Sequence, residues 1–126
     1  MNTNGEKLLL KDEVFQVVAC AIEVLNGVGH GLIEKPYENA LVIEFSLRNT
    51  PFRQQPTFDV LYKSHKIGLF VADLIVFDSI VLDTKVDRIS DHERGLMLNY
   101  LRITGLHVGV IVNFKRRKLE WERIVL

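Results

Sequence analysis

The stretch that decides the fold of this chain reads Ala72-Asp73-Leu74-Ile75-Val76-Phe77-Asp78-Ser79-Ile80-Val81-Leu82-Asp83-Thr84-Lys85. Ile, Val, Phe and Leu dominate two arms that flank an Asp-Ser pair, and this pattern predicts a β-hairpin that turns at residues 78–79. Because side chains in a strand alternate between the two faces of a sheet, Asp83 and Lys85 point to the same side. The hairpin is therefore expected to carry charges on one face.

The pairing register of this hairpin decides where its charges lie. In the register that sets Asp73 opposite Asp83, one face is uniformly apolar and the other carries both carboxylates and Lys85. A slip of one residue would move the two carboxylates to opposite faces and mix polar with apolar side chains on both. The pattern favours the first register, which also pairs Leu74 with Leu82 and Val76 with Ile80.

Two carboxylates and a lysine on one face of a sheet have two interpretations. Charged groups near a core must pair or bind a cation, and paired Asp oxygens suit a hard divalent ion such as Mg2+. Lys85 would then orient an attacking water, or help to deprotonate it, and offset charge on a phosphate. The alternative is a simple ion pair of Lys85 with Asp83 or Asp73 at the end of a sheet.

Composition limits the class of protein. The chain has 126 residues, of which 48% are hydrophobic and 25% charged, so a single domain spanning 1–126 is expected, with a polar start over residues 1–9 that frays. The formal net charge of zero argues mildly against tight non-specific nucleic-acid binding by a monomer. Cys20 is the only cysteine, which excludes an intrachain disulfide. No membrane span and no signal peptide are recognised, and a cytoplasmic location is predicted.

Periodicity predicts the remaining elements. Helices are expected over 11–26, from about 35 to 48, and from Ser90, as cap, to Gly105; strands are expected over 52–63, 67–77, 108–112 and 119–126. Residues 27–31 are predicted to form a loop and 115–118 a basic turn. The order is helix, helix, three strands, helix, two strands. The last helix connects two strands that are therefore expected to be parallel, within a mixed α/β (α+β) sheet flanked by helices.

Glu34 and Glu38 lie about one turn apart at the start of the second helix. The helix dipole favours negative charge there, which is sufficient reason for both residues. A functional role requires the fold to bring one of them to Asp73 and Asp83.

Motifs along most of the chain resemble one known family. Residues Gly31-Leu32-Ile33-Glu34-Lys35-Pro36-Tyr37 fit the pattern GxxExxY. Further matches, in order, are Val71-Ala72-Asp73-Leu74, Val81-Leu82-Asp83-Thr84-Lys85, Leu98-Asn99-Tyr100-Leu101, Gly105-Leu106-His107-Val108-Gly109 and Val112-Asn113-Phe114. The chain thus resembles the GxxExxY family, which is placed in the PD-(D/E)XK nuclease-like superfamily.

The resemblance implies a restriction-endonuclease-like core and assigns roles to residues. Asp73 and Asp83 would be the two acidic residues and Lys85 the lysine of the superfamily motif, with Glu34 or Glu38 as a helix carboxylate that supports the metal, Mg2+ or Mn2+. The chain departs from the family at Gly95, where a Gln is usual.

Three functions follow as hypotheses. The first is a Mg2+-dependent phosphodiesterase acting on DNA or RNA. The second is a catalytically inactive nuclease-fold protein that serves as an oligomeric assembly or partner-binding module; a homo-oligomer is expected in either case, because a small domain with an edge strand has a surface available for pairing. The third is a nucleic-acid-binding accessory domain that uses dispersed cations, namely Arg48, Arg53, Lys115, Arg116, Arg117 and Lys118.

Overall fold

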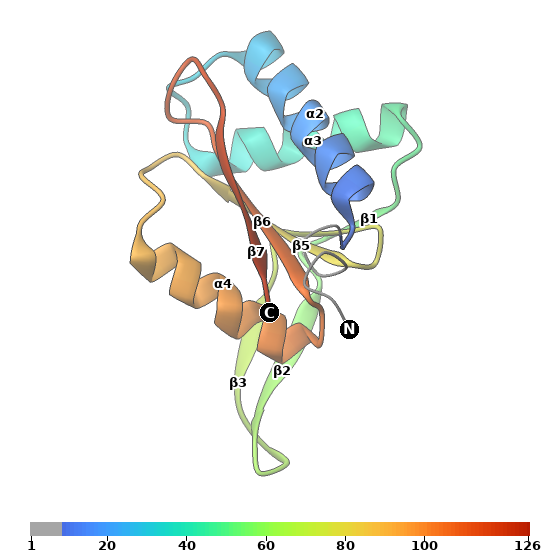
Figure 1. Cartoon of the computed structure of the whole chain (residues 1–126), viewed down its shortest axis with the longest axis vertical. Coiled ribbons are helices and arrows are strands. Elements are labelled where there is room, and N and C mark those ends of the chain that lie inside the picture. The colour runs from blue at the N-terminus through green and yellow to red at the C-terminus, as the bar shows by residue number, and fades with distance from the viewer. Residues whose placement is uncertain (1–8) are drawn as a thin grey trace.

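A five-stranded mixed sheet lies between helices in the computed structural model of this chain, which describes residues 9–126 (Figure 1). The helices are α2 (Lys11–Val28), α3 (Glu34–Leu47) and α4 (Asp91–Thr104). The strands of the sheet, in spatial order, are β1 (Phe52–Gln54), β4 (Leu74–Val76), β5 (Ile80–Lys85), β6 (Val108–Asn113) and β7 (Glu120–Val125). This arrangement confirms the mixed α/β class.

A separate two-stranded hairpin, β2 (Thr57–Tyr62) and β3 (His65–Val71), extends away from the body of the molecule (Figure 1). The element order is therefore ααβββββαββ, and the prediction of three strands between the second and third helices is wrong. The expected strand 52–63 breaks at Gln55-Pro56, where Gln55 has a left-handed φ of 55° and Pro56 has no N–H for a ladder. The expected strand 67–77 breaks at residues 72–73, between β3 and β4.

The predicted register of the central hairpin is confirmed. Strands β4 and β5 pair antiparallel with Leu74 opposite Leu82 and Val76 opposite Ile80. The turn between them includes Phe77 and Asp78, both with positive φ. Strands β5 and β6 are parallel, as expected for strands joined by a crossover helix, here α4.

The sheet is buried on both faces, and each face has its own core. On one face, α2 and α3 pack on apolar side chains of the three middle strands: Leu74, Val76, Ile80, Leu82, Val108, Val110 and Val112. On the other face, Met97 and Leu101 of α4 pack on Ile75, Val81 and Ile111. Residues 81, 83 and 85 alternate with the first core, so Asp83 and Lys85 continue the face that α4 covers.

One predicted helix end differs from the structure, at the end of α2, and one agrees with it, at the start of α4. Helix α2 continues to Val28 instead of ending at residue 26, so Gly27 and Val28 are helical and not part of a loop. Gly29, with a φ of 82°, caps the helix and donates its N–H to Leu25 O at 2.8 Å. The predicted cap Ser90 is confirmed, and it forms a capping box with Glu93, whose carboxylate accepts hydrogen bonds from the backbone N–H and hydroxyl of Ser90.

Two expectations concern the chain as a whole. The fraying predicted for residues 1–9 falls, up to residue 8, outside the described residues. Within residues 9–126, no helix combines the length and the hydropathy that a membrane crossing requires.

Candidate active site

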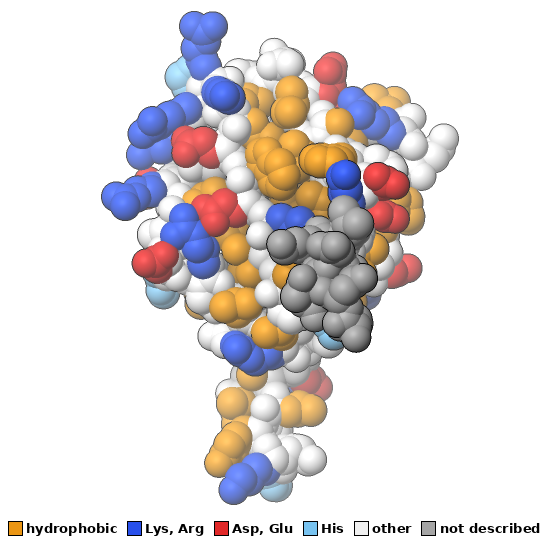
Figure 2. Space-filling model, viewed as in Figure 1, with side chains coloured by type: hydrophobic (Ala, Val, Ile, Leu, Met, Phe, Trp, Pro, Cys, Tyr) orange, Lys and Arg blue, Asp and Glu red, His pale blue; other side chains and the backbone are white. Residues whose placement is uncertain are grey.

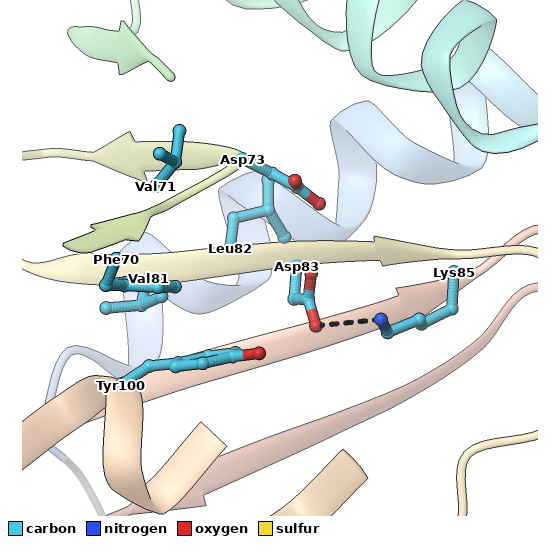
Figure 3. Close-up of a pocket in the computed structure, with 8 residues that line it drawn as sticks. All are labelled: Phe70, Val71, Asp73, Val81, Leu82, Asp83, Lys85 and Tyr100. Carbon is cyan, nitrogen blue, oxygen red and sulfur yellow. Dashed lines mark ion pairs between the residues drawn. The ribbon is translucent and has the colours of Figure 1, made fainter. Parts of the chain in front are cut away.

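A cavity of about 180 Å3 opens beside the central strands, where β3 passes into β4. Its polar lining comes from Asp73, Asp83, Lys85 and Tyr100, and its apolar lining from Phe70, Val71, Val81 and Leu82. Figure 3 shows Asp83 and Lys85 on β5 with their charged groups together, facing the Tyr100 side chain of α4. The fold thus brings together both predicted aspartates and the predicted lysine.

Asp73 is held in place by the strand next to it. It lies just before β4 begins, so it is outside the regular ladder. Its carboxylate oxygen Oδ2 accepts hydrogen bonds from the backbone N–H and the hydroxyl of Thr84, both at 3.0 Å. Its backbone carbonyl accepts the N–H of Gln55 at 2.9 Å. These bonds fix the carboxylate against the residue that separates Asp83 from Lys85.

Asp83 is the most perturbed carboxyl group of the pocket. Its side chain is only 16% exposed, and its Oδ2 lies 3.4 Å from Lys85 Nζ. Burial, a hydrogen bond with the Asp73 carboxyl group and the negative charge of Asp73 raise the pKa of Asp83 to about 7, against the opposing charge of Lys85. Near neutral pH the Asp83 carboxyl group is therefore partly protonated, and a metal cation bound to it would displace that proton.

Lys85 stays charged in this environment. Burial alone would lower the pKa of Lys85, but the charges of Asp83 and Glu34 outweigh it, and the pKa is raised. Lys85 is accordingly an ammonium group at neutral pH, suited to orienting an anion or a water rather than to removing a proton.

Tyr100 forms the wall of the pocket on the side of α4. Its ring stacks on Phe70 of β3, with centroids 4.2 Å apart and an angle of 14° between the rings. Burial and the charge of Asp83 raise the pKa of the Tyr100 hydroxyl, which remains a neutral donor. The sequence places Tyr100 in the family match Leu98-Asn99-Tyr100-Leu101, but no role was predicted for Tyr100 or for Thr84. The available signals were a phenol on the sheet-facing side of the crossover helix and a hydroxyl between Asp83 and Lys85.

The two candidate helix carboxylates lie in different environments. Glu38 is 3% exposed, and its carboxylate accepts hydrogen bonds from Lys35 at 2.7 Å, Gln54 at 2.6 Å and Gln55 at 3.0 Å. Glu38 thereby ties the start of α3 to the segment after β1.

Glu34, the first residue of α3, is exposed but lies within electrostatic reach of the pocket. Partial burial raises the pKa of Glu34; Lys85 opposes this effect, and Asp73 and Glu38 add to it. Glu34 has no hydrogen bond or ion pair from another side chain within residues 9–126, so of the two glutamates it is the one with a carboxylate that is not already engaged.

The tyrosine of the GxxExxY pattern has a structural role. The Tyr37 hydroxyl donates a hydrogen bond to Gly29 O at 2.7 Å and accepts one from the Leu32 N–H at 3.1 Å. Its ring lies parallel to that of Phe114, with centroids 4.4 Å apart. Gly31 adopts a φ of 107°, which favours glycine. Gly31 and Tyr37 therefore shape the loop that presents Glu34.

The donor set of the pocket fits a divalent cation that retains part of its water shell. Within residues 9–126, no three acidic, His or Cys side chains converge into a ready-made metal cluster. Asp73 and Asp83 nevertheless place two carboxyl groups in hydrogen-bonding contact, and burial, this hydrogen bond and the charge of Asp73 together raise the pKa of Asp83. Mg2+ is commonly bound through one or two carboxylates, with waters and substrate phosphate oxygens completing its shell.

Comparison with known proteins gives one match. The model of the PD-(D/E)XK nuclease superfamily matches residues 11–124 of this chain. No curated protein and no solved structure gives a significant match. The matched range contains every residue of the pocket.

Proposed function

This chain belongs to the PD-(D/E)XK nuclease superfamily, and we propose that it is a Mg2+-dependent phosphodiesterase that cleaves nucleic acid. The observation that carries the proposal is the contact between the Asp73 and Asp83 carboxyl groups, with Lys85 Nζ 3.4 Å from Asp83. Superfamily members are typically metal-dependent, and these oxygens would hold the ion.

The three charged residues of the pocket each have a part in the proposed reaction. Asp73 and Asp83 would bind Mg2+, or Mn2+ in its place, once Asp83 has lost its proton. The bound ion would supply Lewis-acid polarisation of a phosphodiester oxygen and activation of a water. The Lys85 ammonium group would orient the attacking water and offset the negative charge that develops on the phosphate.

The helix carboxylate in this proposal is Glu34. It is the exposed glutamate that interacts electrostatically with Asp73 and Lys85, whereas Glu38 already accepts three side-chain hydrogen bonds. Glu34 would accept a hydrogen bond from a metal-bound water, and Glu38 would keep α3 in position.

The finer family assignment is also proposed. Gly31 and Tyr37 of the GxxExxY pattern shape the loop before α3, and this supports membership of the GxxExxY family within the superfamily. We also propose that residues 1–126 form one nuclease-like domain.

A second candidate function is a catalytically inactive, oligomeric partner-binding module. The observation that favours it is the edge strand β7, whose outer side has no neighbouring strand within residues 9–126. Metal binding separates the two functions, because assembly through an edge strand does not require a cation between Asp73 and Asp83.

The direct test is cleavage of labelled single- and double-stranded DNA and RNA by purified protein, with Mg2+, with Mn2+ or with EDTA. The proposal expects metal-dependent cleavage by the wild type that falls at least about 100-fold in Asp83→Asn. Asp59→Asn removes a carboxylate from the exposed pair with Lys66 on β2 and β3 and serves as the matched control. Cleavage that persists in Asp83→Asn, or no cleavage of any substrate by a folded, metal-loaded wild type, would refute the proposal.

A further inference from the structure

A second, larger cleft is lined by residues other than those of the pocket. It encloses about 640 Å3 and runs between the segment that follows β5, the first turns of α4 and strand β7. Its cationic lining comes from Arg88, Arg94 and Arg116, its anionic lining from Glu120 and Glu122, and its apolar lining from Ile89, Leu119 and Trp121. This combination of guanidinium groups and apolar walls is typical of surfaces that bind single-stranded nucleic acid.

The cleft is connected to the end of the candidate catalytic strand. Lys85 is the last residue of β5, and Arg88 follows three residues later. The N–H of Phe114 donates to Lys85 O at 2.9 Å, which joins the start of the β6–β7 connection to the same point. A nucleic-acid strand with one phosphate at Lys85 would therefore pass near Arg88 and the start of the β6–β7 connection.

Half of the six cations in or beside this cleft are unpaired within residues 9–126, since Arg94 pairs with Glu122, Lys115 with Asp87 and Arg116 with Glu120. Within residues 9–126, no ion pair or hydrogen bond engages the side chains of Arg88, Arg117 and Lys118. Arg116 has only a long, exposed contact with Glu120, at 3.7 Å, and such pairs contribute little. Figure 2 shows Lys and Arg side chains gathered over the β6–β7 connection, where four consecutive residues, 115–118, are cationic.

Arg94, in contrast, is fully paired with carboxylates of the protein. Two of its nitrogens contact the two oxygens of Glu122 at 2.7 Å each, and a third contacts Asp91 at 2.7 Å. Its charge is thus satisfied within the protein, and its bonds hold α4 against β7. The cations available to a ligand are the unpaired ones at the rim.

Trp121 connects this cleft to a neighbouring one. An apolar cleft of about 380 Å3 lies on the other side of the β6–β7 connection and shares Leu119 and Trp121 with the first, and its rim adds Arg117 and Lys118. Trp121 therefore shares one cleft with the unpaired Arg88 and the other with the unpaired Arg117 and Lys118. A single strand can place its phosphates on the cations and a base or sugar against the apolar wall.

We propose that Arg88, Arg116, Arg117 and Lys118, together with Trp121, form a binding site for the backbone of single-stranded nucleic acid outside the catalytic pocket. This inference rests on the proposed function for the identity of the ligand, and it extends the contacts of the substrate from the pocket to the cleft between α4 and β7. Trp121 follows the basic turn at residues 115–118 by three positions, so an aromatic side chain lies beside these cations.

The test measures binding without cleavage. A fluorescently labelled single-stranded DNA of 20 nucleotides is titrated with Asp83→Asn protein in EDTA at several salt concentrations, with anisotropy as the readout. The cluster variant Arg88→Gln/Arg117→Gln/Lys118→Gln is expected to bind at least about tenfold more weakly. Its slope of log affinity against log salt should fall by about 2, as expected for three lost phosphate contacts on a single strand.

A charge-matched control separates a site from a general effect of charge. The variant Lys11→Gln/Lys63→Gln/Arg102→Gln also removes three exposed cations, which lie on α2, at the tip of the β2–β3 hairpin and on α4. It is expected to bind within about twofold of the parent. Equal weakening in both variants, no weakening in either, or no binding by the parent would overturn the proposal.

Trp121 provides a local probe, because it is the only tryptophan in the chain. Oligonucleotide binding is expected to change its fluorescence in the parent and in the control variant; an unchanged emission at saturation would contradict the site. The outcome is separable from that of the proposed function. A wild type that cleaves, with a cluster variant that binds as the parent does, would refute only this site, whereas loss of binding in the cluster variant of a protein that never cleaves would refute only the catalysis.

Discussion

The Asp73 carboxylate accepts two hydrogen bonds from Thr84, one from its backbone N–H and one from its hydroxyl, both at 3.0 Å. Thr84 itself is buried, with 2% of its surface exposed. The residue between Asp83 and Lys85 on β5 thus fixes the carboxylate that faces them. The pocket depends on these hydrogen bonds between the residue before β4 and the end of β5.

Replacing Thr84 with Val tests this link. Valine keeps the branched shape and removes the hydroxyl, so the free energy of unfolding should fall by about 1–3 kcal/mol, as expected for a lost hydrogen bond to a charged group. Mg2+ affinity should fall about tenfold, because outer-shell contacts orient metal ligands. Denaturant unfolding and calorimetry measure the two effects. Thr57→Val, on an exposed strand position, is the control, and equal effects in the two variants would contradict the assigned role.

The raised pKa of Asp83 predicts a pH-dependent stability. A carboxyl group with a pKa of about 7 in the folded chain and 3.8 ordinarily holds more protons in the folded state between those values. Its stabilising contribution is therefore fully present below about pH 4 and is lost as the pH rises toward 7.

Asp83→Asn should remove this dependence. Thermal unfolding is expected to show a higher midpoint for the variant than for the wild type at pH 8, without metal, and a smaller difference at pH 5. Asp59→Asn should leave the pH profile of the wild type unchanged. A wild type that gains stability over the variant between pH 5 and pH 8 would show that the pKa of Asp83 is not raised.

Lys85 opposes the rise of the Asp83 pKa, and its removal should show this directly. In Lys85→Met the pKa of Asp83 should move above 7, because the neighbouring positive charge is lost. Carboxyl-carbon NMR titration measures this shift, and Lys66→Met, which removes the exposed partner of Asp59, is the control. Cleavage by Lys85→Met should fall by about 100-fold or more. An unchanged or lower pKa of Asp83 would contradict the ion pair.

The two glutamates of α3 should respond in opposite ways. Glu38→Gln replaces a buried carboxylate that accepts hydrogen bonds from Lys35, Gln54 and Gln55, so the free energy of unfolding should fall by about 1–3 kcal/mol. Glu34→Gln should leave stability within about 0.5 kcal/mol, as for other surface changes, and weaken Mg2+ binding. Chemical denaturation measures the free energy of unfolding of both variants, and calorimetry measures their Mg2+ affinity. Weakened Mg2+ binding in Glu38→Gln, with unchanged binding in Glu34→Gln, would assign the metal role to Glu38.

The sequence predicted the elements whose signals are local. The alternation of apolar residues predicted the register of β4 and β5, and the Ser90–Glu93 box predicted the start of α4. Each of these depends on side chains a few residues apart, so a single chain reveals them.

Other features depend on distant parts of the chain. The strand expected over 52–63 is two strands, because β1 pairs with β4 and β2 pairs with β3 in a different sheet. Pro56, which lacks an N–H, is the local signal in the sequence for this break. Tyr100 reaches the pocket through its stack on Phe70, a contact between residues 30 positions apart that periodicity cannot reveal. The environments of Glu34 and Glu38 likewise depend on Gln54 and Lys85, so the sequence left both open.

The central claim is that Asp73 and Asp83 share a cation-binding pocket, and Mg2+ calorimetry at pH 6.5 in two buffers of different ionisation enthalpy tests it most directly. The account predicts that the wild type binds Mg2+ and releases part of a proton, because the ion displaces the proton held by Asp83. Both signals should vanish in Asp83→Ala and persist in Asp59→Ala. A folded wild type that does not bind millimolar Mg2+, or that binds it equally well without the Asp83 carboxylate, would contradict the claim.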